Sequence, residues 1–333
     1  MSRRRRASWW LAGVGLIIAA ALLLVAQPGD VVGLAGRARW PGLLTALGGT
    51  AVAMLLRGLR LSLLAGRRLR PARATAVAAV WQLASGVLPL RLGELSLIPL
   101  LRAAGLPGTI RALSVTVLAR VLDVLAVLMW AAFGTAAIGG RPLLAIAAVG
   151  VVAVLLTFAW IVGGRALRWL GSRWRKRKSW RRRMLVQLLR ARKELLQLAR
   201  TPAQAFASLL LSVLLWGVIW AVTATLLRAM ALNFPPFLVL LGVIGAAAGS
   251  SLPVNAVGNF GTQEAGWAAA LAGAGVAPRS ALAAGFACHL WGLGFTLVIG
   301  AGALVYLAAG GSGAPSRPFL ARLRSLLIPG RTE

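Results

Sequence analysis

The sequence predicts an all-α membrane protein, a polytopic bundle of helices. Hydrophobic residues make up 59% of the 333 positions, and the mean hydropathy is +0.82. Six apolar runs are long enough to cross a bilayer core of about 30 Å as helices. They cover about residues 9–26, 40–59, 109–138, 143–162, 205–227 and 280–309. Two further apolar segments, about 74–106 and 237–275, are interrupted by Pro, Gly and polar residues, so we expect broken hairpins there.

The first apolar run follows Arg3 to Arg6 and so has the outline of a signal peptide. No small-residue cleavage site follows it, and Gln27-Pro28-Gly29-Asp30 has the composition of a turn. We therefore expect an uncleaved first helix with its N-terminus in the cytoplasm.

Positive charge is concentrated between the apolar runs. The chain has 37 Lys and Arg against 6 Asp and Glu, a formal net charge of +31. In a soluble protein this excess would suggest nucleic acid, but between spans it indicates the positive-inside rule and attraction to anionic lipids, with no nucleic-acid partner. Arg57, Arg60 and the arginines up to Arg73 predict one cytoplasmic face. Residues 165–200 predict a basic cytoplasmic loop, and residues 311–333 a cytoplasmic tail.

The positions of the basic clusters, and the number of spans between them, predict how the two broken segments enter the membrane. Arg73 and Arg165 both belong to the cytoplasmic side, and two full spans lie between them. Residues 74–106 must then enter and leave from the cytoplasm, and 237–275 from the outside if the tail is cytoplasmic. The single membrane domain, 1–333, therefore divides into inverted repeats of about 9–140 and 143–310. That architecture, with broken helices meeting near the midplane, is typical of secondary transporters.

The first broken segment and the span after it carry candidate binding residues. Arg91 and Glu94 follow a Pro, and they would either bind a lipid headgroup or form an ion pair at the cytoplasmic rim. Arg120 and Asp123 share a helix face. Arg120 is roughly 16 Å into its span, where an isolated charge is costly. It would either engage a lipid phosphate, oriented by Asp123, or form a structural salt bridge with Asp123.

The second broken segment carries a denser polar group, and a Glu at membrane depth is a functional candidate. Glu264 would either face the ligand or cap the helix that follows it. His289 would either relay protons with Glu94 and Glu264 or form a hydrogen bond within the bundle. The other candidate substrate-binding residues here are Asn255, Gly258, Asn259 and Gly261, with glycines that allow close backbone approach.

Several classes of chemistry find no support in the sequence. A single cysteine, Cys288, excludes an intramolecular disulfide and a CxxC site. One His and six acids make a multi-ligand zinc site improbable. We found no nucleophile elbow and no phosphate-binding Gly loop with its Lys. We therefore expect no metal and no cofactor; whether the protein is an enzyme stays open, with a transporter preferred.

Three motifs resemble the lysylphosphatidylglycerol synthase transmembrane-region family, a flippase-like membrane domain. Leu88-Pro89-Leu90-Arg91-Leu92-Gly93-Glu94 is similar to the family's Pro-Gly-Arg-x-Gly-Glu, and Arg120-Val121-Leu122-Asp123 to its Arg-x-x-Asp. Pro253 through Gly258, Gly261 and Glu264 is similar to its Pro-x-x-x-Gly-x-Gly-x-x-Glu. Leu90 replaces the expected Gly, and Asn259-Phe260 widens the Gly-x-Gly spacing. The resemblance implies a multi-pass protein of the bacterial inner membrane that binds or moves lipids, without lysyl transfer.

The leading hypothesis is a transporter or flippase that moves a phospholipid or a lipid-linked intermediate between leaflets through a polar midplane cavity. Its partners would be membrane lipids, anionic or lipid-linked. The alternatives are a membrane-embedded lipid-modifying enzyme and an accessory subunit or scaffold of such a system. The sequence does not indicate the substrate, the direction, the energy source or the oligomeric state.

Overall fold

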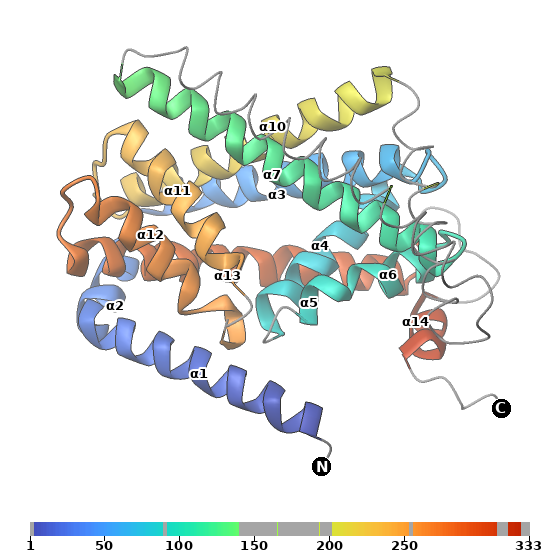
Figure 1. Cartoon of the computed structure of the whole chain (residues 1–333), viewed down its shortest axis with the longest axis horizontal. Helices are drawn as coiled ribbons and strands as arrows, with labels where there is room; N and C mark the ends of the chain where they lie inside the picture. The colour runs from blue at the N-terminus through green and yellow to red at the C-terminus, as the bar shows by residue number, and fades with distance from the viewer. Residues whose placement is uncertain are drawn as a thin grey trace.

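The computed structural model of the protein describes residues 3–88, 92–139, 165, 193, 202–252, 256–311 and 319–327. Every regular element in these ranges is helical (Figure 1). The N-terminal elements are α1 (Arg3–Ala26), α2 (Pro28–Gly36), α3 (Trp40–Leu64), α4 (Pro71–Val87), α5 (Leu92–Leu95), α6 (Leu97–Ala103) and α7 (Thr109–Gly139). The C-terminal elements are α10 (Pro202–Ala229), α11 (Pro236–Ser250), the 3-10 turn η1 (Val257–Asn259), α12 (Thr262–Ala272), α13 (Pro278–Ala308) and α14 (Phe319–Leu327).

Within the described ranges, four helices are long and apolar enough to cross a membrane: α3, α7 through residue 134, α10 and α13. A fifth candidate is the pair α1 and α2, which is bent by 73°. The bend lies at Gln27, whose φ of 58° is in the left-handed region. These helices confirm a membrane helical protein, with four or five candidate spans in the described part of the chain. The expected sixth span, 143–162, and most of the basic loop 165–200 lie outside the described residues.

Both segments that the sequence marked as broken are interrupted helices. The first consists of α4, α5 and α6, and the second of α11, η1 and α12. Prolines open α4 and α11 in the first turn, where the missing N–H costs no helical hydrogen bond. Figure 1 places α4, α5 and α6 toward one end of the bundle and α11 with α12 toward the other.

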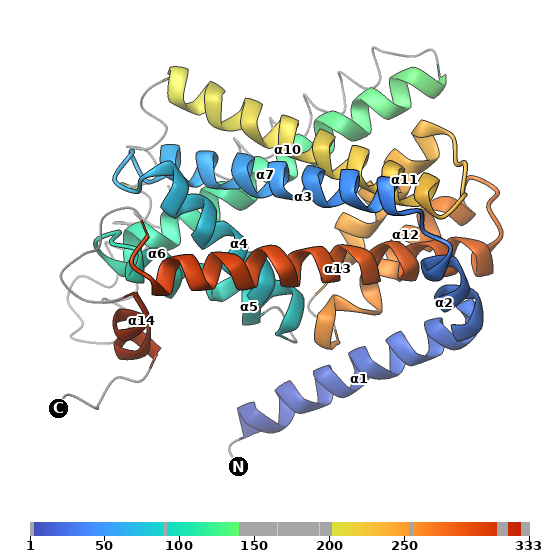
Figure 2. The ribbon, with the colours of Figure 1, turned by 180° about the vertical axis from the view of Figure 1, so that it is seen from behind.

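Long helices surround the two broken segments. α3 lies along α10, and α13 runs beside α4 for much of its length (Figure 2). α7 packs on α10 and also touches α11, while α12 packs between α11 and α13. The first broken segment thus contacts α13, in the C-terminal half, and the second contacts α7, in the N-terminal half. This arrangement brings both breaks to the middle of the bundle.

The ends of the chain pack differently. α14 is amphipathic, with Phe319 buried, Leu323 and Leu326 packed against the core, and Arg324 exposed. It lies against α6. At the opposite end, exposed Arg279 at the start of α13 donates hydrogen bonds of 2.7 and 3.0 Å to Asp30 of α2. That contact connects the α1–α2 bend to the bundle.

Glycines set the distance between α11 and α12. A Cβ on Gly266 would lie 2.1 Å from the carbonyl oxygen of Gly245, and a Cβ on Gly249 would lie 2.0 Å from that of Thr262. Real Cβ atoms do not approach backbone this closely, so the two helices pack backbone to backbone only because these side chains are missing.

Gly266→Ala should therefore prevent α11 and α12 from packing as closely, at a cost of about 1–3 kcal/mol, the range typical of an overpacked contact. Size-exclusion chromatography and thermal unfolding of detergent-solubilised protein would measure the loss. Gly294→Ala on α13 is the matched control, because nothing lies within 4 Å of its added Cβ. Equal stability of both variants would contradict the close packing.

Candidate functional site

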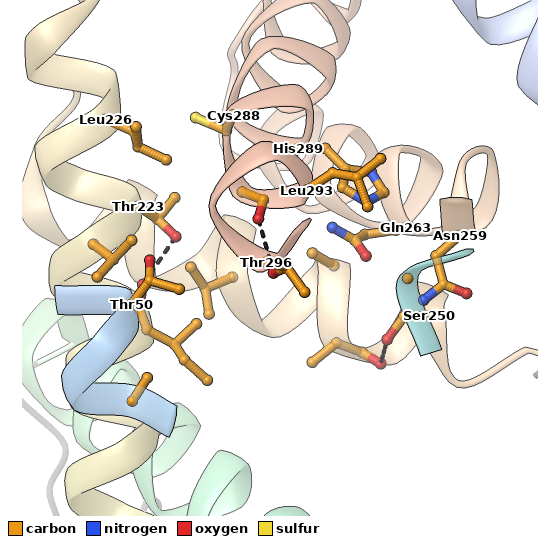
Figure 3. A pocket seen from close by; sticks show the side chains of 18 of the residues that line it. Thr50, Thr223, Leu226, Ser250, Asn259, Gln263, Cys288, His289, Leu293 and Thr296 are labelled. Carbon is orange, nitrogen blue, oxygen red and sulfur yellow. Dashed lines mark hydrogen bonds between the residues drawn. The ribbon is translucent and has the colours of Figure 1, made fainter. Parts of the chain in front are cut away.

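A cavity lies between α3, α4, α10, α11, α12 and α13, where the two broken segments meet. Its volume is about 310 Å³, and most of its wall is apolar. Figure 3 shows Thr50 and Thr223 on one side of it, and His289, Gln263 and Asn259 across from them. Other polar residues that line it are Arg57, Gln82, Ser250, Glu264 and Thr296. A concave, mostly apolar space with few polar groups is the usual form of a ligand site.

The turn of the second broken segment depends on left-handed backbone. Gly258, Asn259 and Gly261 have φ values of 78°, 60° and 107°. Glycine adopts such angles without steric cost, and Asn tolerates them better than most residues. The turn ends at Gly261, whose N–H donates to Glu264 at 2.7 Å. Glu264 therefore satisfies the first backbone donor of α12, which is the capping role expected from the sequence.

Glu264 has a second partner inside the bundle. Its other carboxylate oxygen contacts Nδ1 of His289 on α13. The Phe260 ring lies 4.5 Å from the imidazole ring, centroid to centroid, and covers it. Glu264 is only 1% exposed, so this ion pair or hydrogen bond is shielded. A carboxylate and an imidazole in contact can pass a proton between them. Glu264 thus both caps α12 and binds His289.

The two broken segments touch each other directly. The side-chain amide of Asn259 donates to the carbonyl oxygen of Ser85, in the last turn of α4, at 3.1 Å. Gly86, the next residue of α4, lines the same cavity as Asn259. Both breaks therefore contribute to one site, although they lie more than 160 residues apart in sequence.

Arg57 supplies a cation to the cavity from the middle of α3. Its guanidinium donates to the side-chain oxygen of Gln82 at 2.7 Å and lies 5.7 Å from the centre of the Trp81 ring. Among the described residues, no carboxylate forms a salt bridge with Arg57, and its Nε has no hydrogen-bond partner. Burying a cation without a paired anion is costly, which makes Arg57 a candidate anion-binding group.

A charged cluster lies beside the cavity. Arg60 of α3, which is 0% exposed, pairs with Asp123 of α7 at 2.5 Å and donates to Ser212 of α10 at 2.8 Å. Arg120 pairs with Glu94 and lies 3.5 Å from Asp123. The two arginines of this cluster thus balance its two carboxylates.

Trp81 lies between this cluster and the cavity cation. The guanidinium of Arg120 is 4.7 Å from the centre of the Trp81 ring, and Arg57 contacts the same ring. Arg60 and Arg120 are each paired with a carboxylate, so their charges are balanced. Arg57 therefore carries the excess positive charge of these three arginines and two carboxylates. Its neighbours therefore leave it available for a ligand.

The structure brings together only part of the predicted site. Three of the predicted residues line the cavity: Asn259, Glu264 and His289. Two more, Gly258 and Gly261, form the turn beside it. Arg120 forms a salt bridge with Glu94 and lies 3.5 Å from Asp123, whose shorter contact is with Arg60. The expected Arg120–Asp123 pair is thus the longer of the two contacts of Asp123. Glu94, Arg120 and Asp123 do not belong to the lining of the described cavity. Arg91 and Asn255 lie outside the described residues.

Sequence reasoning missed Arg57 and Gln82 as site residues. Arg57 and Arg60 were assigned to the cytoplasmic rim because more arginines follow them, but α3 continues to Leu64 and holds both inside the bundle. One signal was available: seventeen uncharged residues, 40–56, precede Arg57, and six more, 61–66, follow Arg60 before the next arginine. Gln82 carried no signal beyond its polarity.

The comparison with protein families matches the lysylphosphatidylglycerol synthase TM region over residues 10–300. The chain belongs to this family. The matched range contains both broken segments and the spans around them. Every described residue that lines the cavity therefore lies within it. The searches of curated proteins and of solved structures each returned no match. Members of the family are membrane domains of lipid-related proteins. The long apolar helices likewise show an integral membrane protein.

The chemistry available at the site is binding and proton exchange. Arg57 can bind an anion, and the Glu264–His289 pair can hold a proton. Among the described residues, no group of three or more His, Cys, Asp or Glu side chains is placed to hold a metal ion. Cys288 also lines the cavity, next to His289 in sequence.

Proposed function

We propose that the protein moves a lipid between the leaflets of the bacterial inner membrane, with its headgroup in the midplane cavity. The observation that carries this proposal is a mostly apolar cavity that holds an unpaired arginine. Such a cavity suits the headgroup of an amphiphile whose acyl chains stay in the bilayer. Membership in a lipid-related membrane family supports the same substrate class.

Alternating access would follow from the two broken segments. α4–α6 and α11–α12 lie toward opposite ends of the bundle, and each forms part of the cavity wall (Figure 1). In inverted-repeat transporters the site lies between such segments, and rocking of one half exposes it to each side in turn. We assign the N- and C-termini to the cytoplasm, which agrees with α14 and the start of α1 lying toward the same end of the bundle (Figure 2).

Two charged groups would have separate roles in transport. Arg57 would bind the lipid phosphate, and the Glu264–His289 pair would take up and release a proton as the cavity changes exposure. Glu94, Asp123 and Arg120 would hold the helices around Arg57. Asn259, with the turn from Gly258 to Gly261, would close the cavity against α4.

A side chain that fills the cavity should stop transport. Thr223→Trp adds a large ring at a lining position of α10, and we expect it to abolish most transfer of acyl-labelled phospholipid in proteoliposomes. Ala221→Trp is the matched control, since Ala221 is exposed on the same helix. Access of a membrane-impermeant reductant to the label would measure transfer. Wild-type vesicles no faster than protein-free vesicles would rule out the proposal.

A further inference from the structure

The charge of the cavity lining restricts the headgroup that it can take. The acid among the described lining residues is Glu264, and both of its oxygens are already engaged, by Gly261 N–H and by His289. The unpaired ion in the lining is the cation Arg57. A headgroup ammonium would therefore find no free carboxylate, whereas a phosphate would find a guanidinium.

Unpartnered donors point to an acceptor-rich ligand. Nε of Arg57 and Nε1 of Trp216 have no hydrogen-bond partner among the described residues, and both side chains line the cavity. Buried donors without partners are rare in native proteins because each has lost its hydrogen bonds to water without replacement. Arg57 and Trp216 stand on α3 and α10, which pack along each other, so both donors belong to the same wall of the cavity.

The threonine hydroxyls of the lining are placed to accept hydrogen bonds from a ligand, not to donate them. Thr50, Thr223 and Thr296 each donate to the carbonyl oxygen four residues earlier, at 2.8–2.9 Å. Their hydrogens are thus used within their own helices, and their oxygens can still accept. A ligand that donates O–H groups would complement these three oxygens without bringing in a second charge.

We propose that the cavity is selective for a lipid phosphodiester of net charge −1 whose headgroup bears hydroxyls and no amine. This inference rests on the proposed lipid transport and names its substrate class. Arg57 and Trp216 bind the phosphodiester, and the threonines accept from the headgroup hydroxyls. Aminoacylated and amine-bearing headgroups are disfavoured because Glu264, the carboxylate among the described lining residues, is already engaged.

A panel of lipids labelled on the acyl chain would test this selectivity in proteoliposomes. The probes are phosphatidylglycerol, phosphatidylethanolamine, lysyl-phosphatidylglycerol and polyprenyl phosphate. We expect phosphatidylglycerol to cross at least about tenfold faster than the amine-bearing lipids, since an unpaired ammonium costs more than 1.4 kcal/mol to bury. Trp216→Phe keeps the apolar ring and loses the donor, so it should slow phosphatidylglycerol about tenfold.

The possible outcomes separate this inference from the proposed function. Equal rates for all lipids would overturn the selectivity and leave transport in place, as would a preference for the amine-bearing lipids. No transfer of any probe would overturn both. Uptake of soluble glycerophosphoglycerol into the vesicles at the rate of the lipid would show that the phosphodiester comes from a water-soluble molecule, and would overturn the lipid assignment.

Discussion

Replacing Arg57 by Gln is expected to reduce lipid transport about tenfold to 100-fold while leaving the protein as stable as the wild type, or more stable. The loss of transport follows from removing a charge-assisted hydrogen bond to the phosphate, which is worth about 1.5–3 kcal/mol. The retained stability follows from removing a buried cation that has no paired carboxylate among the described residues. Opposite effects on activity and stability are typical of residues kept for function.

Two measurements on each variant distinguish this role from a structural one. Transport is measured in proteoliposomes, and thermal unfolding in detergent. Arg57→Lys keeps the charge but lacks the planar, bidentate guanidinium, so it should transport at an intermediate rate. If Arg57→Gln lowered the unfolding temperature together with transport, Arg57 would be a packing residue and the anion site would lose its main support.

Asp123→Asn should have the largest effect on stability. Arg60 is completely buried and would lose its counter-ion, keeping only neutral acceptors, the Ser212 hydroxyl and the new amide oxygen. Breaking one side of a buried ion pair typically costs 3–5 kcal/mol, because a buried charge is left uncompensated. The Arg60–Asp123 pair connects α3 to α7, so we expect a marked drop in the unfolding temperature and a smaller yield of folded protein in detergent.

The chain offers a matched control for this ion pair. Asp30 and Arg279 also form a salt bridge, but their side chains are 46% and 52% exposed. Asp30→Asn should therefore change stability by less than about 1 kcal/mol. The double variant Arg60→Met, Asp123→Leu removes both charges and should recover most of the stability that Asp123→Asn loses. Similar losses for the two single variants would contradict the burial argument.

The sequence predicted the helical class and the positions of the breaks because these depend on local composition. Apolar runs of span length anticipated α3, α7, α10 and α13. Pro and Gly marked the interruptions after α4 and after α11, since neither residue supports a continuous helix. The number of spans could not be tested in full, because 143–162 lies outside the described residues, and the inverted repeat stays a prediction.

The pairing of charges could not be predicted in the same way. Asp123 stands three residues from Arg120, so local spacing favoured that pair, but the principal partner of Asp123 comes from α3, 63 residues away. Arg57 lay in a run of arginines that is typical of the cytoplasmic end of a span. Which of them is inside depends on how far α3 continues and on what packs against it, and neither is a local property.

The hydrogen bond from Asn259 to Ser85 has a consequence for the end of α4. The last carbonyl groups of a helix lack an internal partner, and that of Ser85 is satisfied by a side chain from the opposite half of the chain. One half of the protein thus completes a helix of the other. Any movement that parts the two breaks leaves this carbonyl to water or ligand, at a cost of about 1 kcal/mol. A movement that opened the cavity at this point would therefore also uncover the C-terminal end of α4, and the two changes are coupled through this hydrogen bond.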